Sequence, residues 1–206
     1  MSKQTLYPVL ILLLLFSMSI LGNLFHLELF LGVDFIFSSI FVFIILHYFG
    51  PKQAIFTAFA ASIYTIILWG SIYGFITLLA EAIFVSYFYF KRKQNMILWD
   101  AVFLFFIGMP LSYVFSSFFL NLDLMNTLLI MLKQGVNMLF NVLIANILII
   151  LIEAILQSKT KRKVSLQEIL FNLMMLFFLF PLLGSLIYIG QGDLNNVTKR
   201  HPKTDR

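Results

Sequence analysis

Long apolar runs, each close to the length that crosses a membrane, dominate this chain. They cover about residues 6–22, 31–49, 53–69, 72–90, 97–118, 127–156 and 167–190. About 20 apolar residues span the hydrocarbon core of a bilayer. Only 11% of the residues are charged, whereas a soluble domain has about 25%. We therefore predict an all-α integral membrane protein, a polytopic bundle of about seven transmembrane helices, six plus a C-terminal one.

The basic residues lie in short clusters between the apolar runs, and they predict the orientation of the chain. Lys91, Arg92 and Lys93 follow the fourth run, and a second cluster occupies residues 159–163. Cytoplasmic loops carry an excess of Lys and Arg, so we expect both clusters and the N-terminus to lie inside. The basic residues after Gly190 would then lie outside, which is the one part of the chain that disagrees with this rule.

These boundaries divide the chain into four expected parts. They are a six-helix membrane bundle at 1–156, a cytoplasmic basic connection at 157–166, a seventh transmembrane helix at 167–190 and a short tail at 191–206. Within the fifth run, Pro110 removes a helix hydrogen bond and predicts a kink.

The composition excludes several classes of function. There is no cysteine, so disulfide scaffolds, thiolate metal sites and cysteine nucleophiles are excluded. The net charge of +5 arises from loop clusters, so we expect no nucleic-acid partner. The sequence has no glycine-rich phosphate loop, nucleophile elbow or zinc-protease motif. We accordingly predict no enzymatic activity, no metal and no cofactor.

Polar residues inside the apolar runs carry the functional information, because an isolated charge in the bilayer costs several kcal/mol. The spacing of Lys133, Asn137 and Asn141 places them on one face of the sixth helix. We expect them to meet polar residues of the second, third and fourth helices in a cavity that opens outward. The predicted ligand-binding residues are Asp34, Tyr64, Glu81, Lys133, Gln134, Asn137 and Asn141.

Three interpretations of this polar group remain open. The side chains can be interhelical hydrogen-bonding contacts, a site for a small polar or anionic molecule with Lys133 as counter-charge, or a proton relay through Glu81. By contrast, Asp100 and Glu153 lie near the expected cytoplasmic interface, where we expect them to be solvated.

Six segments between residues 31 and 175 carry a resemblance to a known family. They are GVDFIFSSIF (32–41), SIYTIILWGSIYG (62–74), EAIFVSYFYFKRK (81–93), LWDAVFLFFIGMPL (98–111), KQGVNMLFNVLIA (133–145) and KRKVSLQEILFNL (161–173). Together they resemble the multi-pass (MASE-like) membrane input region of bacterial sensor histidine kinases and diguanylate cyclases, without the output domains. Leu104 and Met138 depart from the family pattern, which has an aromatic residue and glycine at these places.

The resemblance implies a sensory domain in the bacterial cytoplasmic (inner) membrane that binds a small ligand in its polar cavity. The expected partners are the lipid bilayer and that ligand, and the sequence leaves a homodimer open. A solute-binding subunit, similar to the substrate-specificity components of vitamin transporters, is the alternative. An assembly protein or helical bundle without a ligand is a third interpretation.

Overall fold

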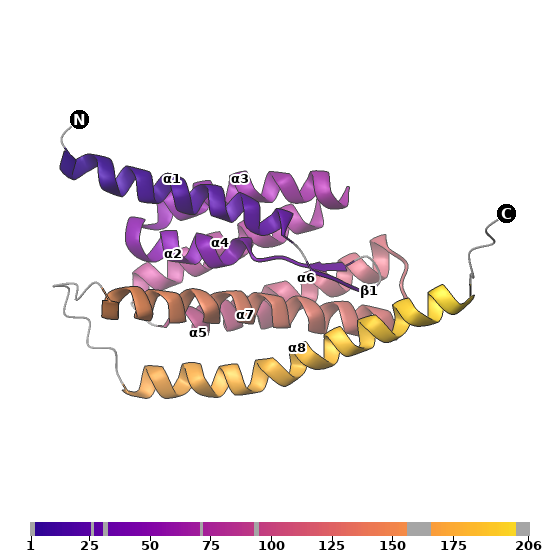
Figure 1. Cartoon of the computed structure of the whole chain (residues 1–206). Coiled ribbons are helices and arrows are strands. Elements are labelled where there is room, and N and C mark those ends of the chain that lie inside the picture. The colour runs from indigo at the N-terminus through magenta and orange to yellow at the C-terminus, as the bar shows by residue number, and fades with distance from the viewer. Residues whose placement is uncertain are drawn as a thin grey trace.

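The computed structural model describes residues 3–25, 27–30, 33–70, 72–92, 95–155 and 166–200, and it is mainly helical (Figure 1). The first half contains α1 (Lys3–Leu24), β1 (Leu27–Phe30), β2 (Val33–Phe35), α2 (Ser38–Phe49), α3 (Pro51–Trp69) and α4 (Tyr73–Arg92). The second half contains α5 (Met96–Phe103), η1 (Leu104–Gly108), α6 (Met109–Val114), η2 (Phe115–Phe119), α7 (Leu124–Ile155) and α8 (Leu166–Arg200).

Helix α7 lies at the centre of this arrangement. It packs against α2, α5, α6 and α8, while α1 packs on α2 and α3, and α4 packs on α3 and α5. Consecutive helices alternate in direction along one common axis (Figure 1). The α4–α5 turn therefore lies at the same end of the bundle as the start of α1, and the hairpin lies at the opposite end.

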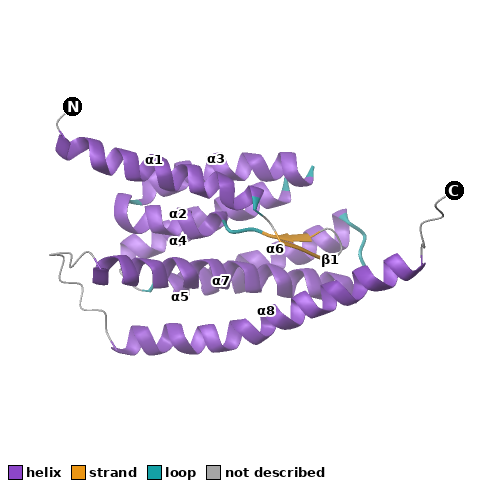
Figure 2. Ribbon diagram, viewed as in Figure 1, coloured by secondary structure: helices purple, strands orange, loops and turns teal. Residues whose placement is uncertain are grey.

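A two-stranded hairpin departs from the expected all-helical fold (Figure 2). β1 and β2 pair in antiparallel register, with Leu27 opposite Phe35. The predicted helix at 31–49 is therefore wrong in its first part, since α2 begins only at Ser38. In each strand one polar residue, Glu28 or Asp34, has apolar neighbours on both sides, which is the period of a strand. The 12 residues of α2 are about 18 Å long at 1.5 Å per residue, shorter than the hydrocarbon core.

Four helical segments are long and apolar enough to cross a membrane. They are Tyr7–Leu24, Tyr73–Arg92, Met96–Phe119 and Leu124–Ile155. Two shorter apolar helices, Ser38–Phe49 and Ile169–Ser185, accompany them among the described residues. These lengths and this composition support a polytopic membrane protein.

The segment from Met96 to Phe119 is one continuous helical rod with two wide turns. The π-helical segments η1 and η2 interrupt the α-helical bonding, and η1 directly precedes Met109 and Pro110. Pro110 has no N–H to donate, so a change in the bonding pattern before it is expected. Where a kink was predicted, the structure thus has a π-helical segment directly before Pro110, and the helix continues through it.

The C-terminal helix is longer than expected. α8 has 35 residues and extends to Arg200, so it includes most of the predicted tail at 191–206. Pro181 lies within it, and the helix bends along its length (Figure 1). The connection predicted at 157–166 lies outside the described residues apart from its last position.

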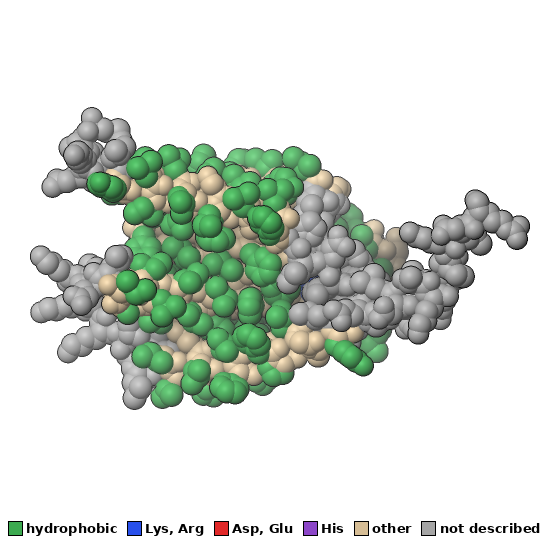
Figure 3. Space-filling view, in the orientation of Figure 1, with side chains coloured by type: hydrophobic (Ala, Val, Ile, Leu, Met, Phe, Trp, Pro, Cys, Tyr) green, Lys and Arg blue, Asp and Glu red, His purple; other side chains and the backbone are tan. Residues whose placement is uncertain are grey.

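The outer surface of the bundle is apolar over a wide area (Figure 3). Large side chains on different helices are mostly exposed, among them Ile67, Phe106, Phe118, Met174 and Phe178. Contiguous apolar surface of this extent is rare on a soluble monomer. A hydrocarbon environment accounts for it, because lipid chains solvate such side chains without cost.

Candidate functional site

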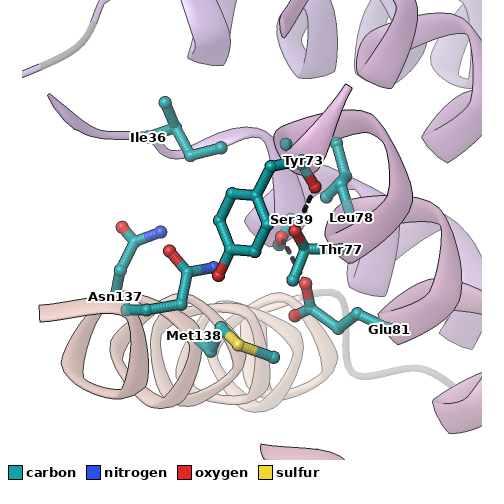
Figure 4. A pocket seen from close by; sticks show the side chains of 10 residues that line it. Ile36, Ser39, Tyr73, Thr77, Leu78, Glu81, Asn137 and Met138 are labelled. Atoms are coloured by element: carbon teal, nitrogen blue, oxygen red, sulfur yellow. Dashed lines mark hydrogen bonds between the residues drawn. The ribbon is translucent and has the colours of Figure 1, made fainter. Parts of the chain in front are cut away.

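A small cavity lies where α2, α4 and α7 meet (Figure 4). Its volume is about 20 Å³, which is room for about one water molecule. The polar residues that line it are Ser39, Tyr73, Thr77, Glu81, Gln134 and Asn137. The cavity therefore combines hydroxyl, carboxyl and amide groups in a space too small for an organic molecule.

Glu81 is the acidic residue of the cavity. Its side chain is 3% exposed, and Ser39 Oγ donates a hydrogen bond to Glu81 Oε2 at 3.3 Å. The other carboxyl oxygen, Oε1, has no hydrogen-bond donor among the described residues. One oxygen of the carboxyl is thus satisfied across the α2–α4 contact, and the other remains available.

The predicted polar face of α7 is buried along its whole length. Asn137 is 3% exposed, lines the cavity, and its Oδ1 has no donor in the described part of the chain. One turn further, Asn141 donates from Nδ2 to the Ile36 carbonyl oxygen at 2.8 Å. Asn141 therefore holds the segment before α2 against α7, whereas Asn137 presents an unused acceptor beside the cavity.

Three of the predicted site residues line this cavity, namely Glu81, Gln134 and Asn137. Asn141 lies one turn away on the same helix, and Tyr64 is half-buried on α3 and does not line the cavity. The Asp34 backbone belongs to β2, and its side chain lies outside the described residues.

Lys133 does not have the position expected for the counter-charge of an anionic ligand. Its side chain is buried and makes an interaction of its own, but it is not part of the cavity lining. The lining contains the carboxyl of Glu81 and no basic side chain among the described residues. This charge balance favours a neutral or positively charged ligand over the anion that the sequence suggested.

Asp100 is a site residue that the sequence analysis missed. We expected it to be solvated at the membrane interface, and this is wrong, since its side chain is 0% exposed. It lies on the buried face of α5 together with Ile97 and Phe103, spaced i, i+3 and i+6. That helical spacing is the signal that could have placed Asp100 inside.

The Asp100 carboxyl meets the Glu81 carboxyl across the α4–α5 contact. The two side chains are near enough for the charge of Asp100 to act on Glu81. Neither Asp100 oxygen receives a hydrogen bond from a described donor. Two neighbouring carboxyl groups cannot both be ionised in a buried place at low cost, so this pair requires a proton or a cation.

A second polar group, also missed, lies at the end of the bundle that contains the α4–α5 turn. His47 Nδ1 is 2.9 Å from Tyr89 Oη, and His47 Nε2 is 3.0 Å from Glu153 Oε1. These residues belong to α2, α4 and α7. Glu153, expected to be solvated, is instead only 16% exposed and paired with His47. The group joins the same three helices that enclose the cavity.

No candidate metal centre with three or more His, Cys, Asp or Glu residues occurs in the described part of the chain. Comparisons with known proteins give no match, whether with family models, with curated proteins or with solved structures. The resemblance to sensor input regions therefore stays a prediction, and the argument for function depends on the geometry of the cavity.

Proposed function

We propose that this chain is the membrane-embedded input region of a bacterial signal-transduction protein, which detects a small polar species at the cavity between α2, α4 and α7. The observation that carries the proposal is the position of this cavity on α7, the helix with the most neighbours in the bundle. A change at Gln134 or Asn137 acts directly on α7, and α7 contacts four other helices.

A specific contact links α7 to α8. Asn146 Nδ2 donates to Asn172 Oδ1 at 3.1 Å, and both side chains are buried. The remaining described face of α8 is mostly apolar and exposed. A hydrogen bond between two buried amides fixes the relative position of two membrane helices, because water does not compete for it. Movement of α7 is therefore expected to move α8 as well. A ligand that binds one arrangement of these helices more tightly than the other would then shift the population toward it.

The size of the cavity favours the input region over the solute-binding transporter subunit. Sites for drug-sized or cofactor-sized molecules have volumes of about 300 to 1,000 Å³, whereas this cavity has about 20 Å³. A species as small as water, a proton or a monatomic cation is compatible with it. No specific feature of the described residues supports a vitamin-sized ligand.

The test of this function is the distance between α7 and α8. The chain has no native cysteine, so spin labels at Leu151→Cys on α7 and Met174→Cys on α8, both exposed positions, report only on these helices. Asn137→Leu removes the unused amide oxygen and fills the cavity. We expect it to change the ratio of the distance populations about 2- to 30-fold, the equivalent of about 0.5 to 2 kcal/mol of coupling.

The matched control for this measurement is Asn126→Leu at the beginning of the same helix. Asn126 contacts Asp123 in the exposed turn before α7 and does not line the cavity. We expect the distance distribution of this variant to equal that of the unsubstituted chain. If Asn137→Leu also leaves the distribution unchanged, the cavity is not coupled to α8 and the input function is excluded.

The proposal includes seven crossings with the N-terminus inside, and this topology has its own test. Asn95 begins α5 and Asp123 precedes α7, at opposite ends of a helical rod of about 36 Å. In intact cells, a membrane-impermeant thiol reagent should label Asp123→Cys and leave Asn95→Cys unlabelled until the cells are opened. Labelling of Asn95→Cys from outside would reverse the orientation.

A further inference from the structure

The Glu81 and Asp100 side chains are unusual because two acids meet inside a membrane bundle. Glu81 is near the middle of α4, and Asp100 is about one turn from the start of α5. Both are fully buried, and three of their four carboxyl oxygens have no described hydrogen-bond donor. Protonation of one acid would supply a donor between the two groups and remove one of the two buried charges.

The surroundings of the pair contain hydroxyl groups and an amide. Ser39 of α2 donates to Glu81, and the charged group that acts on Glu81 from α5 is Asp100. Of the other titratable groups, Tyr73 on α4 lines the same cavity, and Lys133, one turn before Asn137 on α7, makes an interaction of its own. Within the described residues, the groups that act on Glu81 are thus an acid and a hydroxyl.

A second observation indicates how the pair reaches a ligand. Asn137 Oδ1, buried and without a described donor, lies beside the same cavity that Glu81 lines (Figure 4). In Glu81, Asp100 and Asn137, the atoms without a described donor are all acceptor oxygens, and the Tyr73 hydroxyl lines the same cavity. Acceptors without donors call for a proton or a water molecule, and the cavity has room for about one water.

We propose that Glu81 and Asp100 form a proton-binding site inside the membrane, in which the two carboxyl groups share one proton and exchange it with water in the adjoining cavity. On binding, a hydronium ion gives its proton to the carboxylate pair and becomes water. On release, water accepts the proton and becomes hydronium. No other bond is made or broken. The proton is thus the ligand of the proposed input region. Only the consequence of proton binding, a movement of α7, rests on the proposed function.

The physical consequence is a change in the contact between α4 and α5. With the proton bound, the pair has one negative charge and an internal hydrogen bond. Without it, two negative charges lie side by side in a low-dielectric interior, where their repulsion is much stronger than in water. Deprotonation therefore separates Glu81 from Asp100 and changes the cavity wall that Glu81 shares with Asn137 on α7.

Infrared spectroscopy of the complete chain in liposomes tests this directly. A protonated carboxyl group absorbs separately from a carboxylate, and exposed acids are ionised at about pH 7. We expect the unsubstituted protein to retain a carboxylic-acid band at about pH 7 and to lose it in a one-proton step as the pH rises. Absence of the band at about pH 7 would overturn the proposal without any variant being made.

Isosteric neutral substitutions identify the two partners. In Asp100→Asn the like charge is gone, so the band should disappear at a pH lower by at least about one unit, a tenfold change in proton affinity. Glu81→Gln should have the same effect on Asp100. The control is Asp123→Asn, which removes an exposed acid and should leave the band unchanged. A band that is insensitive to Asp100→Asn would mean that one acid acts alone and would refute the pair.

Salt distinguishes a proton site from a cation site. Exchange of K⁺ for Na⁺ or choline in the liposome buffer should leave the band unchanged, and loss of the band in one salt alone would overturn the proton assignment. The spectroscopic result is independent of the α7–α8 distance measurement. A normal band with no effect of Asn137→Leu on the helix distance would remove the input function and retain the proton site.

Discussion

Replacing Gly22 with valine is expected to destabilise the bundle by about 3 kcal/mol, because an added side chain would meet backbone atoms. A Cβ at this position would lie 3.0 Å from Phe37 C and 3.0 Å from Ser38 N. Backbone atoms cannot rotate away as a flexible side chain can, so α1 would have to move. Overpacking of a well-packed core costs about 1 to 3 kcal/mol, and this contact lies at the upper end of that range.

The cost includes polar contacts that depend on the same close approach. Gly22 O accepts from Phe37 N at 2.9 Å, and Ser19 Oγ lies 2.9 Å from Ser38 Oγ. Asn23 Nδ2 donates to the Ala61 carbonyl oxygen at 2.8 Å, which joins α1 to α3. Displacement of α1 would lengthen all three contacts. Small residues at such contacts allow membrane helices to approach closely.

The measurement is the detergent composition at which the purified protein unfolds, for example the fraction of dodecyl sulfate in mixed micelles. The matched control is Gly184→Val on α8, since a Cβ there would have no atom within 4 Å. Both variants replace a helical glycine with the same residue, so the difference between them reports packing alone. Equal unfolding midpoints for the two variants would contradict the close approach of α1 to α2.

His47→Phe is expected to destabilise the end of the bundle that contains the α4–α5 turn by about 1.5 to 3 kcal/mol, the usual range for a hydrogen bond to a charged group. The phenyl ring is similar in shape but loses the contacts of both ring nitrogens, to Tyr89 at 2.9 Å and to Glu153 at 3.0 Å. Because the three residues come from three helices, their loss should increase amide exchange at the ends of α2, α4 and α7.

Two tyrosines on α4, one that contacts His47 and one that does not, allow the contribution of the His47 contacts to stability to be measured. Tyr89→Phe removes the contact with His47, which is partly buried, and should cost about 0.5 to 1.5 kcal/mol. Tyr87→Phe removes an exposed contact with Lys91, four residues further along α4, and should have a smaller effect, because surface contacts contribute little. If the two variants are equally stable, the His47 group does not hold the helices together.

The helical membrane character was readable from the sequence because long apolar runs leave the chain few alternatives. In hydrocarbon, a segment must satisfy its backbone hydrogen bonds internally. The runs predicted at 53–69, 72–90 and 127–156 correspond to α3, α4 and α7 within a few residues. Local chemistry also marked particular points, such as Pro51 at the first position of α3.

The pairing of polar residues was decided only by the tertiary structure. The sequence indicated that Lys133, Asn137 and Asn141 share a face of one helix, and all three are buried. It did not indicate that Glu81 meets Asp100, because the rotation and the relative height of two packed helices depend on side-chain shape. Likewise, it did not indicate that the beginning of the run predicted at 31–49 forms the strand β2.

The sequence does not show which polar groups meet, because the bilayer is as apolar as the interior of the protein. In a soluble protein, the polar face of a helix marks the side toward water, and the apolar face marks the core. In a bilayer both the lipid side and the core side are apolar, so Phe43, which is buried, and Phe106, which is exposed, look alike in the sequence. Hydropathy therefore predicted long apolar helices that suit a membrane, and packing alone determined which of the few polar groups meet.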